Sequence, residues 1–86
     1  MKSVMNYHEA KTKVMDVITS RLLETGNAVP PMEETTEILG GSLPLDSLEL
    51  AVIVLKLQEA TGVDPFASGF VEFQTIGELA RLYATK

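Results

Sequence analysis

The sequence contains no cysteine, and this absence removes several kinds of site at once. Without thiols the chain can form neither disulfides nor a thiolate metal site, and it has no cysteine nucleophile. Its single histidine, His8, belongs to no serine-histidine pattern, and the hydrolase signature Gly-x-Ser-x-Gly is missing. Glu33, Glu34 and Glu37 lack the alternating spacing and the glycine of a calcium loop. We therefore expect neither a catalytic residue nor a metal site, and a protein that is not an enzyme.

Basic residues and long apolar runs are also scarce. Seven Lys and Arg stand against twelve Asp and Glu, a formal charge of −5, so the chain is a poor candidate for nucleic acid and a better one for basic patches on proteins. The longest apolar run, Leu50 to Leu55, is far shorter than the roughly 18–20 residues of a membrane helix. Residues 1–6 lack the features of a signal peptide. These absences predict a cytoplasmic protein that binds neither nucleic acid nor membrane.

Helix signals divide the chain of 86 residues, which we interpret as one small domain over 1–86. Capping patterns and stop residues predict helices over about 6–25, 47–61 and 75–84, with a loop over about 26–46 and a short helix or turn over about 66–72. A buried strand through Val52-Ile53-Val54 is less consistent with a stretch of this length that is capped at both ends. The paired start signals are Asn6 with Glu9, Asp46 with Glu49, and Thr75 with Glu78; the stop signals are Gly26, Gly62 and Pro65.

The two non-helical segments carry apolar residues that must pack somewhere. Pro30-Pro31 and Gly40-Gly41 exclude a continuous helix from the loop, whose apolar side chains are expected to pack onto the helices. Phe66, Phe70 and Phe73 are expected to anchor the short element before the last helix. The sum is an all-α bundle with one long first crossover.

The most informative residues are Leu45-Asp46-Ser47-Leu48. A serine in the first turn of a helix lies beside unpaired backbone N–H groups and the positive end of the helix dipole, which suits a phosphate ester. Taken alone, however, the tripeptide Asp46-Ser47-Leu48 is a common pattern, and Ser47 could be an ordinary first-turn residue behind the Asp46 cap.

The residues around this motif favour a modified serine over an ordinary first-turn serine. Without a gap, residues 45–63 resemble the phosphopantetheine-attachment segment of acyl and peptidyl carrier proteins, and the likeness extends to the Thr75-Ile76-x-Glu78-Leu79-Ala80 opening of the last helix. One position departs from the family pattern, because Pro44 stands where a glycine is common. The resemblance implies a small four-helix bundle of the acyl-carrier type, with a long first loop and a short third helix.

The resemblance also implies a function. Ser47 would carry a 4′-phosphopantetheine arm, taken from coenzyme A, whose thiol holds cargo as a thioester. Asp46 would help a phosphopantetheinyl transferase and its magnesium ion to engage the chain. The expected protein is a freestanding, monomeric acyl carrier of a dedicated biosynthetic pathway, whose partners are the transferase, an acyl- or aminoacyl-loading ligase or synthase, and downstream enzymes. Two alternatives stay open: an aminoacyl or peptidyl carrier, and an unmodified helical interaction module of the same fold.

The helix after Ser47 is then the expected docking surface. Leu50, Ile53, Val54 and Leu57 form the stripe expected to face the core. An apolar outward set has two interpretations: loop residues such as Leu43 and Leu45 cover it, or it binds partners through apolar contact. The predicted partner-binding residues are Leu48, Glu49, Ala51, Val52 and Leu55.

Overall fold

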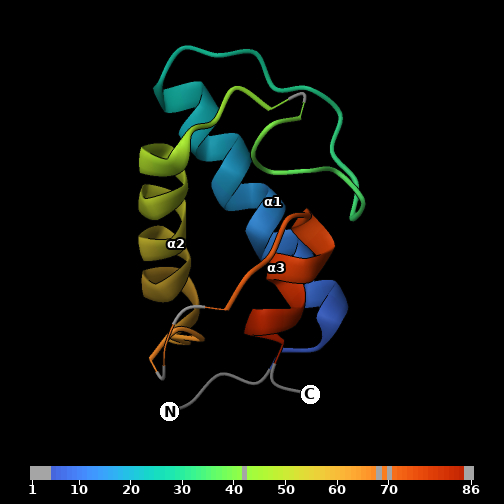
Figure 1. Cartoon of the computed structure of the whole chain (residues 1–86), viewed down its shortest axis with the longest axis vertical. Helices are drawn as coiled ribbons and strands as arrows, with labels where there is room; N and C mark the ends of the chain where they lie inside the picture. Colours follow the sequence, from blue (N-terminus) through green and yellow to red (C-terminus); the bar gives the residue numbers. More distant parts are fainter. Residues whose placement is uncertain (1–4, 42, 68, 70, 85–86) are drawn as a thin grey trace.

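The computed structural model describes residues 5–41, 43–67, 69 and 71–84, and over these ranges the protein is all-helical. Three helices follow one another: α1 (Tyr7–Glu24), α2 (Ser47–Thr61) and α3 (Ile76–Tyr83). Figure 1 shows α2 and α3 on opposite sides of the molecule, with α1 running between them and the long connector looping over one end. Within the described part, no helix combines the length and the apolar character needed to cross a membrane.

The ends of α1 are set by the residues that cap it. The side chain of Asn6 accepts a hydrogen bond from the Glu9 amide at 2.8 Å, and the Glu9 carboxylate accepts one from the Asn6 amide at 3.1 Å. At the other end Gly26 adopts a φ of 79°, and the Asn27 amide donates to the Leu22 carbonyl at 2.9 Å. This second arrangement is a Schellman motif, which satisfies carbonyls that the helix leaves unpaired. Both the predicted capping box and the glycine stop are confirmed.

The core forms where α1 meets the other two helices. One face of α1 is fully buried, and it packs more extensively on α3 than on α2. Val17 and Arg21 lie at the edge of this face and are partly buried. The buried helical side chains of the core are Ala10, Val14, Ile18, Leu22, Ile53, Leu57, Ile76, Leu79, Ala80 and Tyr83.

Backbone hydrogen bonds tie the connector to the start of α3. The Ile38 amide donates to the Gln74 carbonyl at 2.8 Å, and the Gly77 amide donates to the Glu34 carbonyl, also at 2.8 Å. Tyr7 of α1 reaches the same place, where its hydroxyl donates to the Glu34 carboxylate at 2.8 Å. The connector therefore packs onto the helices as expected, and Ile38 is buried in the core.

The expected fourth helix is not present among the described residues. After Gly62, which ends α2 with a φ of 72°, the chain makes successive turns: the Ala67 amide donates to the Asp64 carbonyl, and the Gly69 amide to the Phe66 carbonyl. Of the predicted short helix or turn over about 66–72, the described residues therefore show turns, and the expected count of four helices is not confirmed. Phe70 lies outside the described residues.

The close approach of the connector to α3 requires glycine at position 77. A Cβ there would lie 2.9 Å from the Glu34 carbonyl oxygen and 2.9 Å from the Tyr7 hydroxyl oxygen, and the backbone atom cannot swing away. We expect Gly77→Ala to lower the free energy of unfolding, measured by urea denaturation, by about 1–3 kcal/mol. Thr12→Ala on the exposed face of α1 is the control, with an expected change within about 0.5 kcal/mol. Where its side chain meets no neighbour, alanine stabilises a helix by up to about 1 kcal/mol relative to glycine. A Gly77→Ala protein that is more stable than wild type would therefore contradict this close packing.

Candidate functional site

Ser47 is the first residue of α2, and the chain that precedes it is held in place. The Leu45 amide donates to the Leu43 carbonyl at 2.9 Å, which closes a γ-turn around Pro44, whose fixed φ suits that position. Leu43 is buried and Leu45 partly buried, so both anchor the approach to the helix. The departure at Pro44 therefore has a local structural role, and it leaves Ser47 exposed.

Asp46 caps the helix immediately before Ser47. Its backbone is extended, and its Oδ1 atom accepts a hydrogen bond from the Glu49 amide at 2.9 Å. The predicted N-cap is confirmed. An exposed hydroxyl at this place faces the positive end of the helix dipole, which stabilises a negatively charged ester by about 0.3–1 kcal/mol.

Glu49 does not complete the capping pattern that the sequence suggested. Its two carboxylate oxygens accept hydrogen bonds from Arg21 of α1, from Nε at 2.5 Å and from Nη2 at 3.3 Å. This two-point ion pair raises the pKa of Arg21, chiefly through the hydrogen bond to Glu49. A guanidinium satisfies both carboxylate oxygens in one plane, whereas the Asp46 amide offers a single N–H, so the contact with α1 replaces the local one.

The surface of α2 around Ser47 is largely apolar. Leu48 is 73% exposed and Leu55 is 56% exposed, while Ala51 is exposed and Val52 is partly buried. The connector therefore does not cover Leu55, although Leu43 does pack into the core. One continuous surface of this helix, which we call the α2 surface, consists of Leu48, Ala51, Val52 and Leu55, with Glu49 at its edge.

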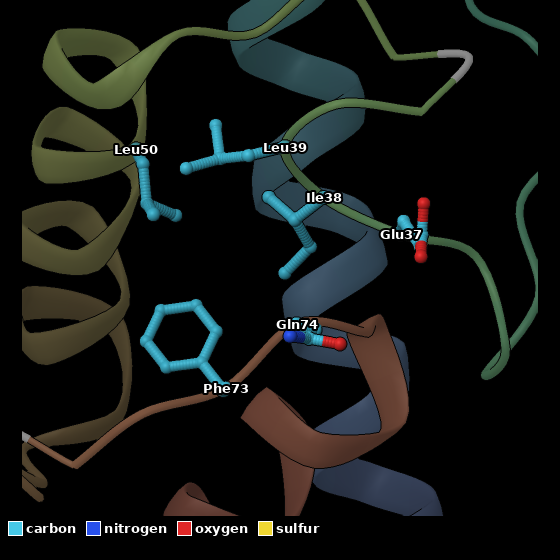
Figure 2. Close-up of a pocket in the computed structure, with 6 residues that line it drawn as sticks. All are labelled: Glu37, Ile38, Leu39, Leu50, Phe73 and Gln74. Atoms are coloured by element: carbon cyan, nitrogen blue, oxygen red, sulfur yellow. The ribbon is translucent and has the colours of Figure 1, made fainter.

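An apolar cavity of about 480 Å³ opens beside Ser47. A second cavity, of about 320 Å³, adjoins it and shares three of its walls, Leu39, Leu50 and Phe73. In Figure 2, Leu39 of the connector and Leu50 of α2 point toward one another beside the Phe73 ring, whereas Glu37 points away. The first cavity is lined by Leu39, Ser47, Leu50, Ala51, Val54, Phe66 and Phe73.

Sequence reasoning missed these cavities, although it named several of their walls. Leu50 and Val54 were assigned to the core stripe, yet both are only partly buried, unlike Ile53 and Leu57. The apolar character of Leu39 in a loop was the only available signal. Nothing local in the sequence says that Leu39 and Phe73 approach α2 from two separate segments.

Other candidate groups lie away from Ser47. His8 lines a surface hollow with Ala60 and Thr61, at the C-terminal end of α2, about 20 Å along the helix from Ser47. The chain therefore does not place its imidazole beside the serine hydroxyl. In the described ranges, no group of three or more His, Asp or Glu side chains is arranged to hold a metal ion.

Comparison with known proteins identifies the family. The family model for the phosphopantetheine attachment site matches residues 20–83, more than half of the chain. The solution structure of MacpD, an acyl carrier protein from Pseudomonas fluorescens involved in mupirocin biosynthesis, is similar, with a TM-score of 0.82 and 28% identity over 93% of this chain and 72% of that one. No curated protein matches the chain.

The matched family fixes the chemical role in general terms. Members carry 4′-phosphopantetheine as their cofactor, and they are carriers rather than catalysts. An exposed serine at a capped helix start, beside an apolar cavity, fits such a group. This chain belongs to the phosphopantetheine-attachment family of acyl and peptidyl carrier proteins.

Proposed function

We propose that this protein is an acyl carrier that holds acyl intermediates as thioesters on a 4′-phosphopantetheine arm attached to Ser47. The observation that carries the proposal is the position of Ser47, exposed at the capped N-terminus of α2 within the segment that matches the family. When bound, the arm supplies the thiol that forms the thioester. The protein supplies a rigid attachment point, because the Asp46 cap and the anchored γ-turn fix the helix start.

Attachment requires only one reacting atom from this chain. The Ser47 hydroxyl oxygen bonds to the phosphorus on the pantetheine side of coenzyme A, and the pyrophosphate bond breaks. Adenosine 3′,5′-bisphosphate leaves, and the serine proton is released to solvent. A phosphopantetheinyl transferase and its magnesium ion catalyse this exchange, and Asp46 is the residue that we expect to assist them. Its carboxylate has one oxygen in the cap, and its side chain is exposed, so a partner can approach it.

The cavity beside Ser47 favours an acyl cargo over an aminoacyl one. Apart from Ser47 itself, every residue that lines it is apolar. An acyl chain that folds back from the arm could bury methylene groups there, each worth about 0.8 kcal/mol. A charged amino group would lose its hydration in the same place without a hydrogen-bonding partner.

The partners that we propose act in turn on the same face. After the transferase, an acyl-loading ligase or synthase and then downstream pathway enzymes dock on the α2 surface, beside the arm. The protein works as a monomer in the cytoplasm, in a dedicated biosynthetic pathway. The 28% identity to MacpD, a carrier involved in mupirocin biosynthesis, supports such a pathway.

The direct test is covalent modification of Ser47. We expect co-expression with a broad-specificity transferase to add the mass of one phosphopantetheine to the protein, measured by intact-mass spectrometry. Ser47→Ala should abolish the addition, because no other hydroxyl stands at the start of α2. Ser20→Ala, which removes an exposed serine from α1, is the matched control and should be modified normally. An unmodified wild-type protein would instead support the alternative of a helical interaction module.

The two roles of Asp46 can be separated by one substitution. Asparagine caps helices about as well as aspartate, so Asp46→Asn should leave the free energy of unfolding within about 0.5 kcal/mol of wild type. It removes the charge, so we expect kcat/KM for arm transfer to fall by about tenfold or more, which corresponds to roughly 1.4 kcal/mol. Asp46→Ala should show the same loss of transfer and also lose about 1 kcal/mol of stability. Transfer to Asp46→Asn at the wild-type rate would restrict Asp46 to its role as a cap.

Introducing negative charge into the α2 surface tests whether partners dock there. We expect Leu55→Glu and Val52→Glu together to reduce kcat/KM for acyl loading by the cognate ligase or synthase by about tenfold or more, since a buried apolar contact becomes a desolvated carboxylate. Leu23→Glu is the control, because Leu23 is 63% exposed but belongs to α1. Equal loading of all three proteins would place docking elsewhere.

A further inference from the structure

Arg21 joins the end of α1 to the start of α2. Besides its two hydrogen bonds to Glu49, its Nη1 atom lies 3.5 Å from the Glu24 carboxylate. That carboxylate in turn lies 3.9 Å from the Nζ atom of Lys56, which belongs to α2. The four side chains form a chain of alternating charge along the groove between the two helices.

The other helices of the protein show that Glu49 had a local alternative. All three helices begin with a capping residue and carry a glutamate three positions later. In α1 and α3 that glutamate, Glu9 or Glu78, turns back to accept a hydrogen bond from the amide of its own capping residue. Only at α2, the helix that bears Ser47, does the glutamate reach a different helix, because Arg21 is there.

This ion pair neutralises Glu49, the one charged residue of the α2 surface as defined above. Glu49 lies two positions after Ser47 on the α2 surface, and its carboxylate is already paired at two points. Lys56 follows Leu55 in α2, and its Nζ atom lies 3.9 Å from the Glu24 carboxylate. The exposed carboxylates of Asp46 and Glu59 border the α2 surface on either side. Charges on a docking surface mainly steer and select partners, so internal pairing removes a means of attracting basic side chains. What remains for a partner is the exposed apolar set centred on Leu48 and Leu55.

We propose that Arg21 is a specificity-determining residue: by holding Glu49, it keeps the α2 surface electrically neutral, and so favours partner enzymes that dock through an apolar patch over those that dock through basic side chains. The inference rests on the proposed function, because the α2 surface matters for specificity only if Ser47 is presented to partners. It predicts that releasing Glu49 changes the kind of partner that binds.

The experiment compares two synthetic helical peptides with the same leucine face, one flanked by lysines and the other by glutamines. Dissociation constants are measured for the purified chain at low and at high salt concentration. Wild type should bind both peptides within about twofold of each other. Arg21→Gln should prefer the lysine peptide by about fivefold or more at low salt, as expected for one newly available carboxylate near a surface, and high salt should remove the preference.

Two variants show whether the effect belongs to Glu49. Adding Glu49→Gln to Arg21→Gln should return the preference to the wild-type value. Lys13→Gln removes one positive charge from an exposed position about 12 Å further along α1, and it should also behave as wild type. If Arg21→Gln loses the helical signal in circular dichroism, Arg21→Met, which keeps the apolar stem of the side chain, takes its place.

The proposal is overturned if the Arg21 variant has no more preference than wild type, including no measurable binding of either peptide. It is also overturned if Lys13→Gln gives the same preference, or if the preference survives Glu49→Gln, because net charge alone would then explain it. The same variants are tested for addition of phosphopantetheine. Normal modification without a change in preference rejects the role of Arg21 alone, whereas loss of modification in wild type rejects the proposed function.

Discussion

The arrangement around Ser47 depends on the backbone hydrogen bonds between the connector and the start of α3. They fix residues 34–38 against residues 74–77, and so they place Leu39 and Phe73 opposite α2. Gly77 makes this approach possible, since any side chain there would meet the Glu34 carbonyl. A segment without helical structure thereby becomes a wall of the site, and its backbone groups find partners as buried groups must.

The site combines rigidity at one atom with adaptability around it. The Asp46 cap and the γ-turn at Pro44 fix the start of α2, so they hold the point at which the arm would attach in one position. The helix supplies one side of the cavity, and the other side comes from the connector and the segment after α2, which can adjust more easily than a helix. Such a division suits a carrier, which presents one group to several enzymes while holding its attachment point still.

A charged residue on one helix changes the hydrogen bonding at the start of another helix in this protein. The same cap and glutamate pattern occurs three times in this chain, and twice it closes on itself. At α2 the outcome differs because the guanidinium of Arg21 lies across the groove, offering two donors and a full charge. Arg21 is partly buried at the edge of the core, and this placement brings it to Glu49.

The sequence by itself determined the helices, their caps and the position of Ser47, because these features follow from contacts between residues three or four apart. It also predicted which faces are apolar, since a helix of fixed period must bury a continuous stripe. Only the tertiary structure decided the rest: the turns where a fourth helix was expected, the cavity between Leu39, Leu50 and Phe73, and the pairing of Glu49 with Arg21. The cavity and the ion pair each join segments far apart in the chain, and which of several possible partners a side chain meets is set by the packing of the whole molecule.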